Sequence, residues 1–303
     1  MTGRLPIRTG IYTNTHFGRN SVFFPNVTGG LKAEEETIAE ILAARGYRNK
    51  AIGKWHIGNT EESHPMNQGF HEFFGSNGNH LGPHDNINTP NVEVFRDRDM
   101  VGRYFEREFF MNLETGESNL TRLWTEDALE FIERNQDVPF FLYWAADGTH
   151  TPLGAAKEFL GTSQRGLYGD VVRDLDYGVG QIIAKLKELK LHRNTLYFSL
   201  LIMAQLVTRV WNIEKEPATV MDLFNTILDV TGSEVSNPQR PLDGQSLCLL
   251  INKPKMHIEE EQILYRGDVS FAVRVGNTRR ITDLDTGRKG IFNVLKLLSH
   301  RPT

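Results

Sequence analysis

The chain has 303 residues, of which 39% are hydrophobic and 24% charged, and its formal net charge is −4. This length suits one large α/β domain or two smaller ones, and the slightly acidic balance without a basic block disfavours nucleic acid as a partner. No apolar run is long enough to span a membrane, so no membrane-spanning helix is predicted. The opening MTGRLPIRTG lacks the apolar core of a signal peptide, so no signal peptide is predicted.

The first predicted elements are a helix, a strand and a long loop. Residues 34–45 are acidic at the start, apolar at helical spacing and basic at the end, and Gly46 follows, so this pattern predicts a helix. Residues 50–54 are predicted as a short strand. Residues 60–90 are rich in Gly, Asn, His and Pro, which predicts a long irregular segment of the kind that often carries function. A second amphipathic helix is predicted over residues 122–135.

The central part of the chain continues this alternation. The apolar, aromatic run over residues 138–146 is typical of a strand buried on both faces, and the polar turn DGTHTP follows it. A helix is predicted over about residues 168–190 and another strand over residues 194–198. The order strand, helix, strand predicts an α/β fold with a parallel sheet and right-handed crossovers.

Three residues are candidates for a site at one edge of this sheet. Lys54 and His56 lie two positions apart in GYRNKAIGKWHIG, and in a strand both side chains would lean to the same side, as an anionic ligand requires. His56 and His150 both follow predicted strand ends, where ligands bind in parallel sheets. A solvated lysine and structural histidines are the competing explanation. The histidines of residues 60–90 match no metal-ligand spacing, so no metal site is predicted there.

Several stretches resemble the sulfatase family in one order along the chain. GYRNKAIGKWHIG resembles the second sulfatase signature, G-Y-x-[ST]-x-x-x-G-K-W-H-x-G, with Asn49 where Ser or Thr is usual. The opening TGRLPIRTGIY resembles the end of the first signature. HPMNQGFHEFFG, FRDRDMVGRYFE, PFFLYWAADGTHTP and FLGTSQRGLYGDVVRDLD also fit. The resemblance covers residues 1–198 almost continuously and returns over about residues 217–275.

The resemblance implies a fold, an activity and roles for the three candidates. The fold would be alkaline-phosphatase-like, a mostly parallel sheet flanked by helices, and the activity would be hydrolysis of sulfate esters, on galactosamine or galactose 6-sulfate of glycosaminoglycans. In the family, a formylglycine nucleophile attacks sulfur and a calcium ion stabilises the charge. By position, Lys54 would bind sulfate oxygens and His56 would hold the nucleophile. His150 would bind sulfate and protonate the leaving alcohol.

The resemblance also implies partners and a location. A sulfated glycan or an aryl sulfate would be the substrate, a homodimer is possible, and the protein would lie in the lysosome or the secretory pathway. The N-x-[ST] sequons at Asn26 and Asn119 are candidate glycosylation sites that agree with this route.

The sequence departs from the family where the nucleophile and the metal ligands are expected. It contains no C-x-P-S-R, and its single cysteine, Cys248 in QSLCLL, lacks that context. Residues 200–207 read LLIMAQLV where an Asp-Asn metal pair is implied, and codons read two nucleotides out of frame could restore that pair. No metal ligand is therefore predicted. The alternative function is a catalytically inactive fragment or pseudo-sulfatase that retains only an anion-binding edge.

The predicted domain organisation follows from the same departures. Residues 1–215 are predicted to form a sulfatase-like α/β domain that is truncated at its N-terminus and lacks its first strand. Residues 216–303 are predicted to be a partial C-terminal region, a short remnant whose tail after about residue 275 does not resemble the family.

Overall fold

The computed structural model describes most of the chain, namely residues 1–11, 29–78, 80–199 and 218–252, together with the backbone of four strands between residues 261 and 293. The chain divides into two compact units. One comprises residues 23–208, and the other comprises residues 1–22 and 209–303. The domain boundary at residue 215 stays a prediction, and it lies close to the division observed at residue 208.

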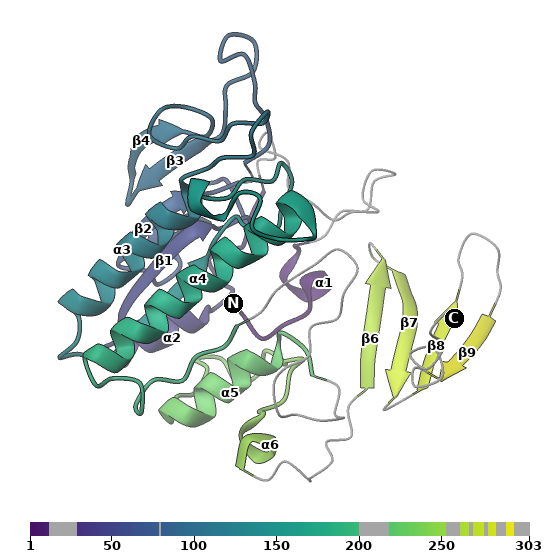
Figure 1. Cartoon of the computed structure of the whole chain (residues 1–303). Coiled ribbons are helices and arrows are strands. Elements are labelled where there is room, and N and C mark those ends of the chain that lie inside the picture. The colour runs from purple at the N-terminus through teal and green to yellow at the C-terminus, as the bar shows by residue number, and fades with distance from the viewer. Residues whose placement is uncertain are drawn as a thin grey trace. The chain divides into compact units, whose positions relative to one another are not determined.

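The larger unit is built on a five-stranded sheet with the order β4-β3-β2-β1-β5 (Figure 1). Its strands are β1 (Arg48–Lys54), β2 (Glu72–Ser76), β3 (Glu93–Arg96), β4 (Asp99–Arg103) and β5 (Phe140–Ala145). β1 pairs in parallel with β2 on one side and with β5 on the other, whereas β2–β3 and β3–β4 are antiparallel. The parallel part is the part that the alternation of strands and helices predicts.

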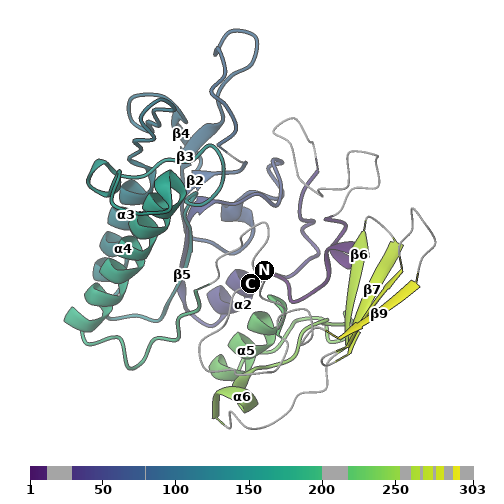
Figure 2. The same ribbon diagram turned by 45° about the vertical axis from the view of Figure 1, so that its right-hand side comes forward.

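Helices cover both faces of this sheet. α3 (Leu120–Arg134) and α4 (Gly166–Glu188) pack side by side on one face, and α2 (Ile38–Ala44) lies on the other (Figure 2). Two single-turn 3-10 helices, η2 (Pro65–Asn67) and η3 (Lys157–Phe159), lie in the connections. The helices predicted over residues 122–135 and 168–190 are confirmed.

α2 begins later than its acidic start predicts. The Thr37 hydroxyl accepts a hydrogen bond from the Glu40 backbone N–H at 3.1 Å, and the Glu40 carboxylate accepts one from the Thr37 N–H at 2.7 Å. This reciprocal pair is a capping box, which satisfies two N–H groups that the first helical turn leaves without partners. The sequence signal for the start was therefore T-x-x-E and not the acidic run before it.

The core of the larger unit joins α3 to the sheet. Trp124 of α3 is fully buried and its ring packs against Phe74 of β2, with the ring centroids 4.8 Å apart. Ile52 of β1 and Val94 of β3 belong to the same buried cluster. Burying an aromatic or branched side chain stabilises the fold by about 1.5–3 kcal/mol each, so this cluster fixes α3 over the strand ends that carry the candidate site.

Two strand predictions after β1 need correction. The strand predicted over residues 194–198 is wrong, because these described residues pair with no other strand in the described chain and Tyr197 is 59% exposed. An apolar run forms a strand only where a neighbouring strand supplies hydrogen-bonding groups. The prediction that β5 is buried on both faces is also wrong, because β5 lies at the end of the strand order and is half-buried along its whole length.

The described part of the smaller unit contains three short helices and an antiparallel sheet. The helices are α1 (Pro6–Thr9), α5 (Asp222–Thr231) and α6 (Cys248–Asn252), and the sheet has the order β6 (Glu261–Arg266), β7 (Val269–Val275), β8 (Thr278–Thr282) and β9 (Lys289–Asn293). The Asp243 carboxylate accepts hydrogen bonds from the Leu5 N–H and from Arg8 Nε, both at 2.8 Å. These bonds tie the first residues of the chain to the segment before α6.

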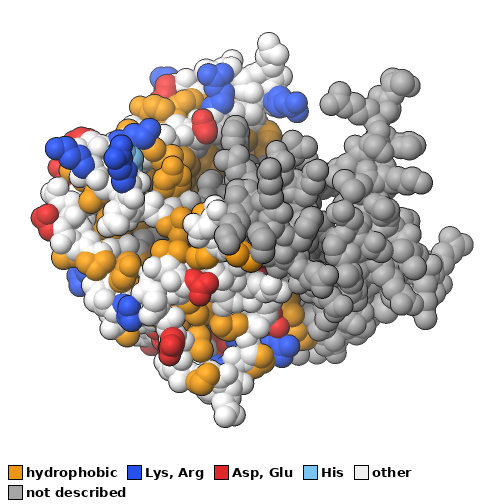
Figure 3. Space-filling model, turned by 90° about the horizontal axis from the view of Figure 1, so that it is seen from below, with side chains coloured by type: hydrophobic (Ala, Val, Ile, Leu, Met, Phe, Trp, Pro, Cys, Tyr) orange, Lys and Arg blue, Asp and Glu red, His pale blue; other side chains and the backbone are white. Residues whose placement is uncertain are grey.

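The surface of the described residues has a mixed character. Lys and Arg side chains lie interspersed with Asp and Glu and with hydrophobic side chains on the face shown in Figure 3. Among the described helices, none combines the length and the apolar character needed to cross a membrane.

Candidate functional site

Lys54 and the turn after β5 meet at one edge of the sheet. Lys54 is the last residue of β1, and the parallel register places Gly53 beside Ala145, the last residue of β5. Asp147 and His150 follow directly in the turn over residues 147–152. The carboxyl ends of adjacent parallel strands lie at the same edge, so the topology brings these side chains toward a common space.

Gly53 permits the close approach of β1 and β5 before Lys54. Its φ is +88°, and a Cβ atom built on it would overlap the carbonyl oxygen of Ala145. Gly75 of β2 faces Gly53 from the other side, and a Cβ there would overlap the Gly53 carbonyl. Only glycine satisfies both the left-handed backbone and the packing, which gives a structural reason for the glycine that precedes Lys54.

We predict that Gly53→Ala destabilises the chain by about 1–3 kcal/mol or more, because the strained φ adds to an overlap with backbone that cannot move aside. The matched control is Gly46→Ala. Gly46 has φ +83°, and no atom lies within 4 Å of a Cβ built there, so this control reports the backbone strain alone. Urea unfolding of both variants measures the difference. Equal losses of stability would show that the approach to Ala145 costs nothing.

Trp55 and His56 leave the sheet in a defined turn. The Trp55 N–H donates to Ser76 O at 2.9 Å and the His56 N–H to Asn77 O at 3.0 Å, which extends the pairing beyond β1 and β2. Trp55 Nε1 donates to Ser63 O at 2.8 Å from a buried ring. Because His56 lies past the strand with φ 55°, strand alternation does not orient it relative to Lys54. The role of His56 in holding a nucleophile stays a prediction.

A buried carboxylate organises the turn after β5. Asp147 Oδ1 lies 3.0 Å from His80 Nδ1, and Asp147 Oδ2 accepts hydrogen bonds from Tyr104 Oη at 3.1 Å and from Trp124 Nε1 at 2.9 Å. All four side chains are buried. Burial alone would raise the pKa of Asp147, but the hydrogen bonds and the charge of His80 outweigh burial and lower it. Asp147 is therefore a carboxylate held by three donors.

His150 and Lys54 belong to the same electrostatic group. The ring of His150 lies nearly perpendicular to that of His80, with the centroids 5.3 Å apart, and its Nδ1 lies 2.6 Å from Thr151 O. Burial and the charge of Lys54 lower the pKa of His150. Burial also lowers the pKa of Lys54, while the charge of Asp147 acts in the opposite direction. An anion bound here would favour the charged forms of both Lys54 and His150.

The sequence did not predict that His80 and Asp147 belong to the electrostatic group of Lys54 and His150. His80 counted only as one of several loop histidines without metal-ligand spacing, and Asp147 as part of a turn. The two are 67 positions apart in the chain, and nothing in the local sequence of either indicates the other. The only available signal was an aspartate immediately after an apolar strand, at the end where ligands bind.

The described residues do not fit a calcium ion. Within the part of the chain that the structure describes, no group of three or more His, Cys, Asp or Glu side chains is placed to hold a metal ion. Calcium takes about 6–8 oxygen ligands, and the one carboxylate of this group, Asp147, already has both oxygens hydrogen-bonded. Residues 200–207, where the metal pair was implied, lie outside the described residues.

Cys248 does not fit the formylglycine nucleophile. It lies in α6, half-buried, with its Sγ 3.9 Å from Thr226 O, and it lacks the C-x-P-S-R context.

The structure describes one of the two candidate glycosylation sites, Asn119, but not the other. Asn26 lies outside the described residues. Asn119 is the residue before α3, and its side chain bridges the backbone of the preceding segment. Its Nδ2 donates to Glu108 O at 2.8 Å and its Oδ1 accepts from the Phe110 N–H at 3.0 Å. Glycosylation of both asparagines stays a prediction.

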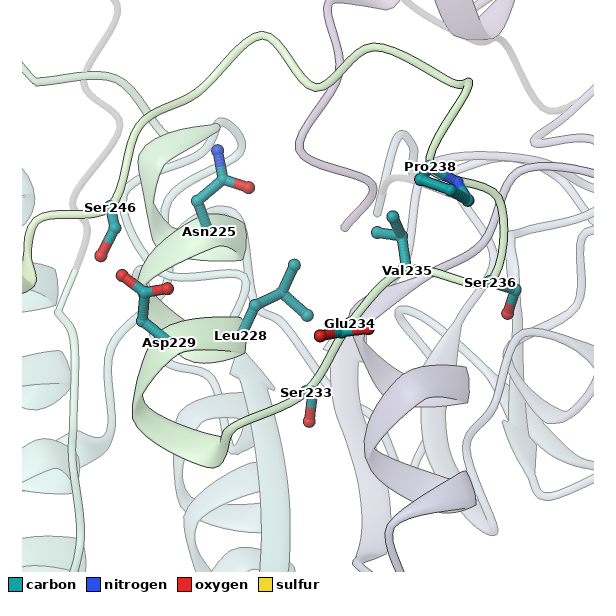
Figure 4. Close-up of a pocket in the computed structure, with 9 residues that line it drawn as sticks. All are labelled: Asn225, Leu228, Asp229, Ser233, Glu234, Val235, Ser236, Pro238 and Ser246. Atoms are coloured by element: carbon teal, nitrogen blue, oxygen red, sulfur yellow. The ribbon is translucent and has the colours of Figure 1, made fainter.

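A cavity of about 660 Å³ lies in the smaller unit between α5 and the segment that follows it (Figure 4). Its lining includes Asn225, Asp229, Glu234 and Ser246 but no Lys, Arg or His. A lining with two carboxylates repels an anion, so this cavity is not an alternative place for the anionic ligand that Lys54 suits.

The fold is an α/β fold that presents titratable side chains at the carboxyl ends of parallel strands. A family model described as Sulfatase matches residues 1–200, and the chain belongs to the sulfatase family. The family and the fold class predicted from the sequence are both confirmed.

Individual relatives agree with this assignment. The chain is 40% identical to N-acetylgalactosamine-6-sulfatase of Sus scrofa over 91% of this chain and 60% of that protein. It is 37% identical to an arylsulfatase of Hemicentrotus pulcherrimus over 65% of this chain and 36% of that protein. The chain thus spans about 60% of the length of the N-acetylgalactosamine-6-sulfatase that it matches.

A solved structure shares the fold. The crystal structure of Ps i-CgsB in complex with k-i-k-neocarrahexaose matches with a TM-score of 0.74 over 99% of this chain and 75% of that chain, at 19% identity. This likeness concerns the fold alone.

Proposed function

We propose that the protein acts in the hydrolysis of sulfate esters on galactosamine or galactose of glycosaminoglycans, and that Lys54 and His150 bind the sulfate group. The observation that carries the proposal is the common electrostatic group of Lys54, His80, Asp147 and His150 at the edge of the parallel strands. Sequence identity to N-acetylgalactosamine-6-sulfatase supports the substrate class. A homodimer and a location in the lysosome or the secretory pathway are part of the same proposal.

The two side chains would act on the sulfate in different ways. The Lys54 ammonium is a compact charge on a flexible stem and can follow the oxygens of a tetrahedral anion. Nδ1 of His150 faces the carbonyl oxygen of Thr151, so the proton that titrates is the one on Nε2. A protonated Nε2 would donate to a sulfate oxygen or to the oxygen of the leaving alcohol. Partial burial strengthens both interactions by excluding water.

The proposal predicts that Lys54→Ala weakens sulfate binding. Isothermal titration of the full chain with inorganic sulfate and with N-acetylgalactosamine 6-sulfate measures the affinity. Loss of a charged hydrogen bond should weaken binding by roughly 10-fold or more. Lys187→Ala is the matched control, because Lys187 is exposed at the C-terminal end of α4. Unchanged affinity in Lys54→Ala would remove Lys54 from the site.

An activity assay separates hydrolysis from binding alone. The sequence contains no C-x-P-S-R, so we expect the 303-residue chain to turn over an aryl sulfate no faster than Lys54→Ala/His150→Ala. Binding without turnover is thus the result expected of these 303 residues. It supports the role of Lys54 and His150 in binding sulfate, and it fits equally the second candidate, a sulfatase-family chain that binds sulfate groups without hydrolysing them. Turnover above that of the double variant would show that this chain carries a nucleophile of its own.

A further inference from the structure

Both ring nitrogens of His80 face oxygen acceptors. Nε2 lies 3.2 Å from the carbonyl oxygen of Pro152, and a carbonyl can only accept, so Nε2 carries a proton. Nδ1 lies 3.0 Å from Asp147 Oδ1. Either this nitrogen is also protonated, which makes the ring an imidazolium, or Asp147 carries the proton as a neutral acid.

The other contacts of Asp147 select the charged pair. Asp147 Oδ2 accepts two hydrogen bonds, from Tyr104 and from Trp124, and both donors favour a carboxylate over a carboxylic acid. Burial would lower the pKa of His80, but its hydrogen bond to Asp147 and the charge of Asp147 outweigh burial and raise it. Charge and geometry therefore agree on an imidazolium beside a carboxylate.

We propose that His80 and Asp147 form a buried imidazolium–carboxylate pair in which His80 is a positioning residue, holding the ring of His150 and placing a fixed positive charge beneath it. The protonation state of the pair is inferred from the contacts of His80 and Asp147 alone. The use of the pair in recognising a sulfate ester rests on the proposed function.

Packing keeps the two rings in place. His80 and His150 both border a cavity of about 10 Å³, which has room for about one water molecule. Tyr104 packs against His80 from another side, with the ring centroids 5.7 Å apart. The titratable groups that face or act on the ring of His80 are Asp147, Tyr104, His150 and Lys54. The last two are the candidate sulfate-binding residues.

The pair has a consequence for His150. The positive charges of Lys54 and His80 both oppose a third charge on His150, in addition to its burial. His150 is therefore held neutral above its lowered pKa and takes up a proton when an anion offsets the two cations. His80 therefore keeps its proton to a higher pH than His150, which gains a proton when an anion binds.

Nitrogen-15 NMR of the full chain labelled in histidine tests the pair without any substitution. We expect both nitrogens of His80 to stay protonated as the pH rises above 6.5, its ordinary pKa, while His150 loses its proton below that value. The His80 signals are identified by the contact of its ring with His150. A His80 ring that turns neutral at or below pH 6.5 would overturn the proposal.

A variant then tests the positioning role. His80→Gln removes the positive charge, so the pKa of His150 should rise, whereas exposed His192→Gln should leave it unchanged. An unchanged pKa of His150 in His80→Gln would show that His80 does not act on it. Adding inorganic sulfate to the unsubstituted chain distinguishes a failure of the proposed function from a failure of the charged His80–Asp147 pair. If the charged pair is observed and sulfate shifts no His150 signal, the proposed function fails and the pair stands.

Discussion

Lys50→Met is expected to lower the free energy of unfolding by about 3–5 kcal/mol. The side chain of Lys50 is 2% exposed, and its ammonium lies 2.6 Å from Asp127 Oδ2 and 3.2 Å from Glu72 Oε2. Removing one partner of a buried ion pair leaves the other charge buried without compensation, which is the costly outcome. Asp127 keeps its contact with Arg96 at 2.9 Å, so we expect the loss near the lower end of this range.

The matched control for Lys50→Met is Arg134→Met, because Arg134 contacts the same carboxylate, Glu72. Arg134 binds Glu72 at 2.9 Å, but its side chain is 49% exposed, so water screens the pair and its loss should cost about 1 kcal/mol or less. Chemical unfolding of both variants gives the comparison. Similar losses for Lys50 and Arg134 would mean that burial adds nothing to the strength of this network.

The sequence predicted correctly those helices and strands that can be recognised from neighbouring residues alone. α3 and α4 have apolar residues at helical spacing over their whole length, and β1 and β5 are bounded by glycine or polar turns. Residues 196–198 are apolar, as β5 is, but residues 194–198 have no partner strand in the described chain, and composition does not report partners. Lys50 likewise reads as a surface lysine, because its two carboxylate partners come from β2 and α3.

For the same reason, the sequence predicted only two of the four side chains in the electrostatic group of the candidate site. Lys54 and His150 lie at strand ends, which sequence patterns locate, and family signatures include both. His80 and Asp147 become a pair only when the loop after β2 folds back over the end of β5, a contact between distant positions. Sequence reasoning therefore finds the side chains that would touch the ligand more readily than the buried side chains that orient them.

Asp147→Asn is expected to destabilise the chain by about 3–5 kcal/mol at mildly acidic pH. An amide cannot balance an imidazolium, so the variant would either bury an unpaired charge at His80 or force that ring to give up its Nδ1 proton and accept a hydrogen bond from the amide instead. Asp137→Asn is the matched control, since Asp137 is exposed in the turn after α3. A loss of stability as small as that of the control would show that Asp147 is not a buried carboxylate.

The pH dependence of this loss separates the charged pair from mere packing. The pKa of His80 is raised above 6.5, so its contribution to stability is complete below that pH and is lost as the pH rises toward the folded value. The pKa of Asp147 is lowered from 3.8, so its contribution is complete above that pH and is lost as the pH falls toward the folded value. The destabilisation by Asp147→Asn should therefore be larger at about pH 5.5 than at about pH 8.5. A destabilisation that does not change between these two conditions would assign the effect of Asp147 to shape and hydrogen bonding, because only a charged His80 makes it depend on pH.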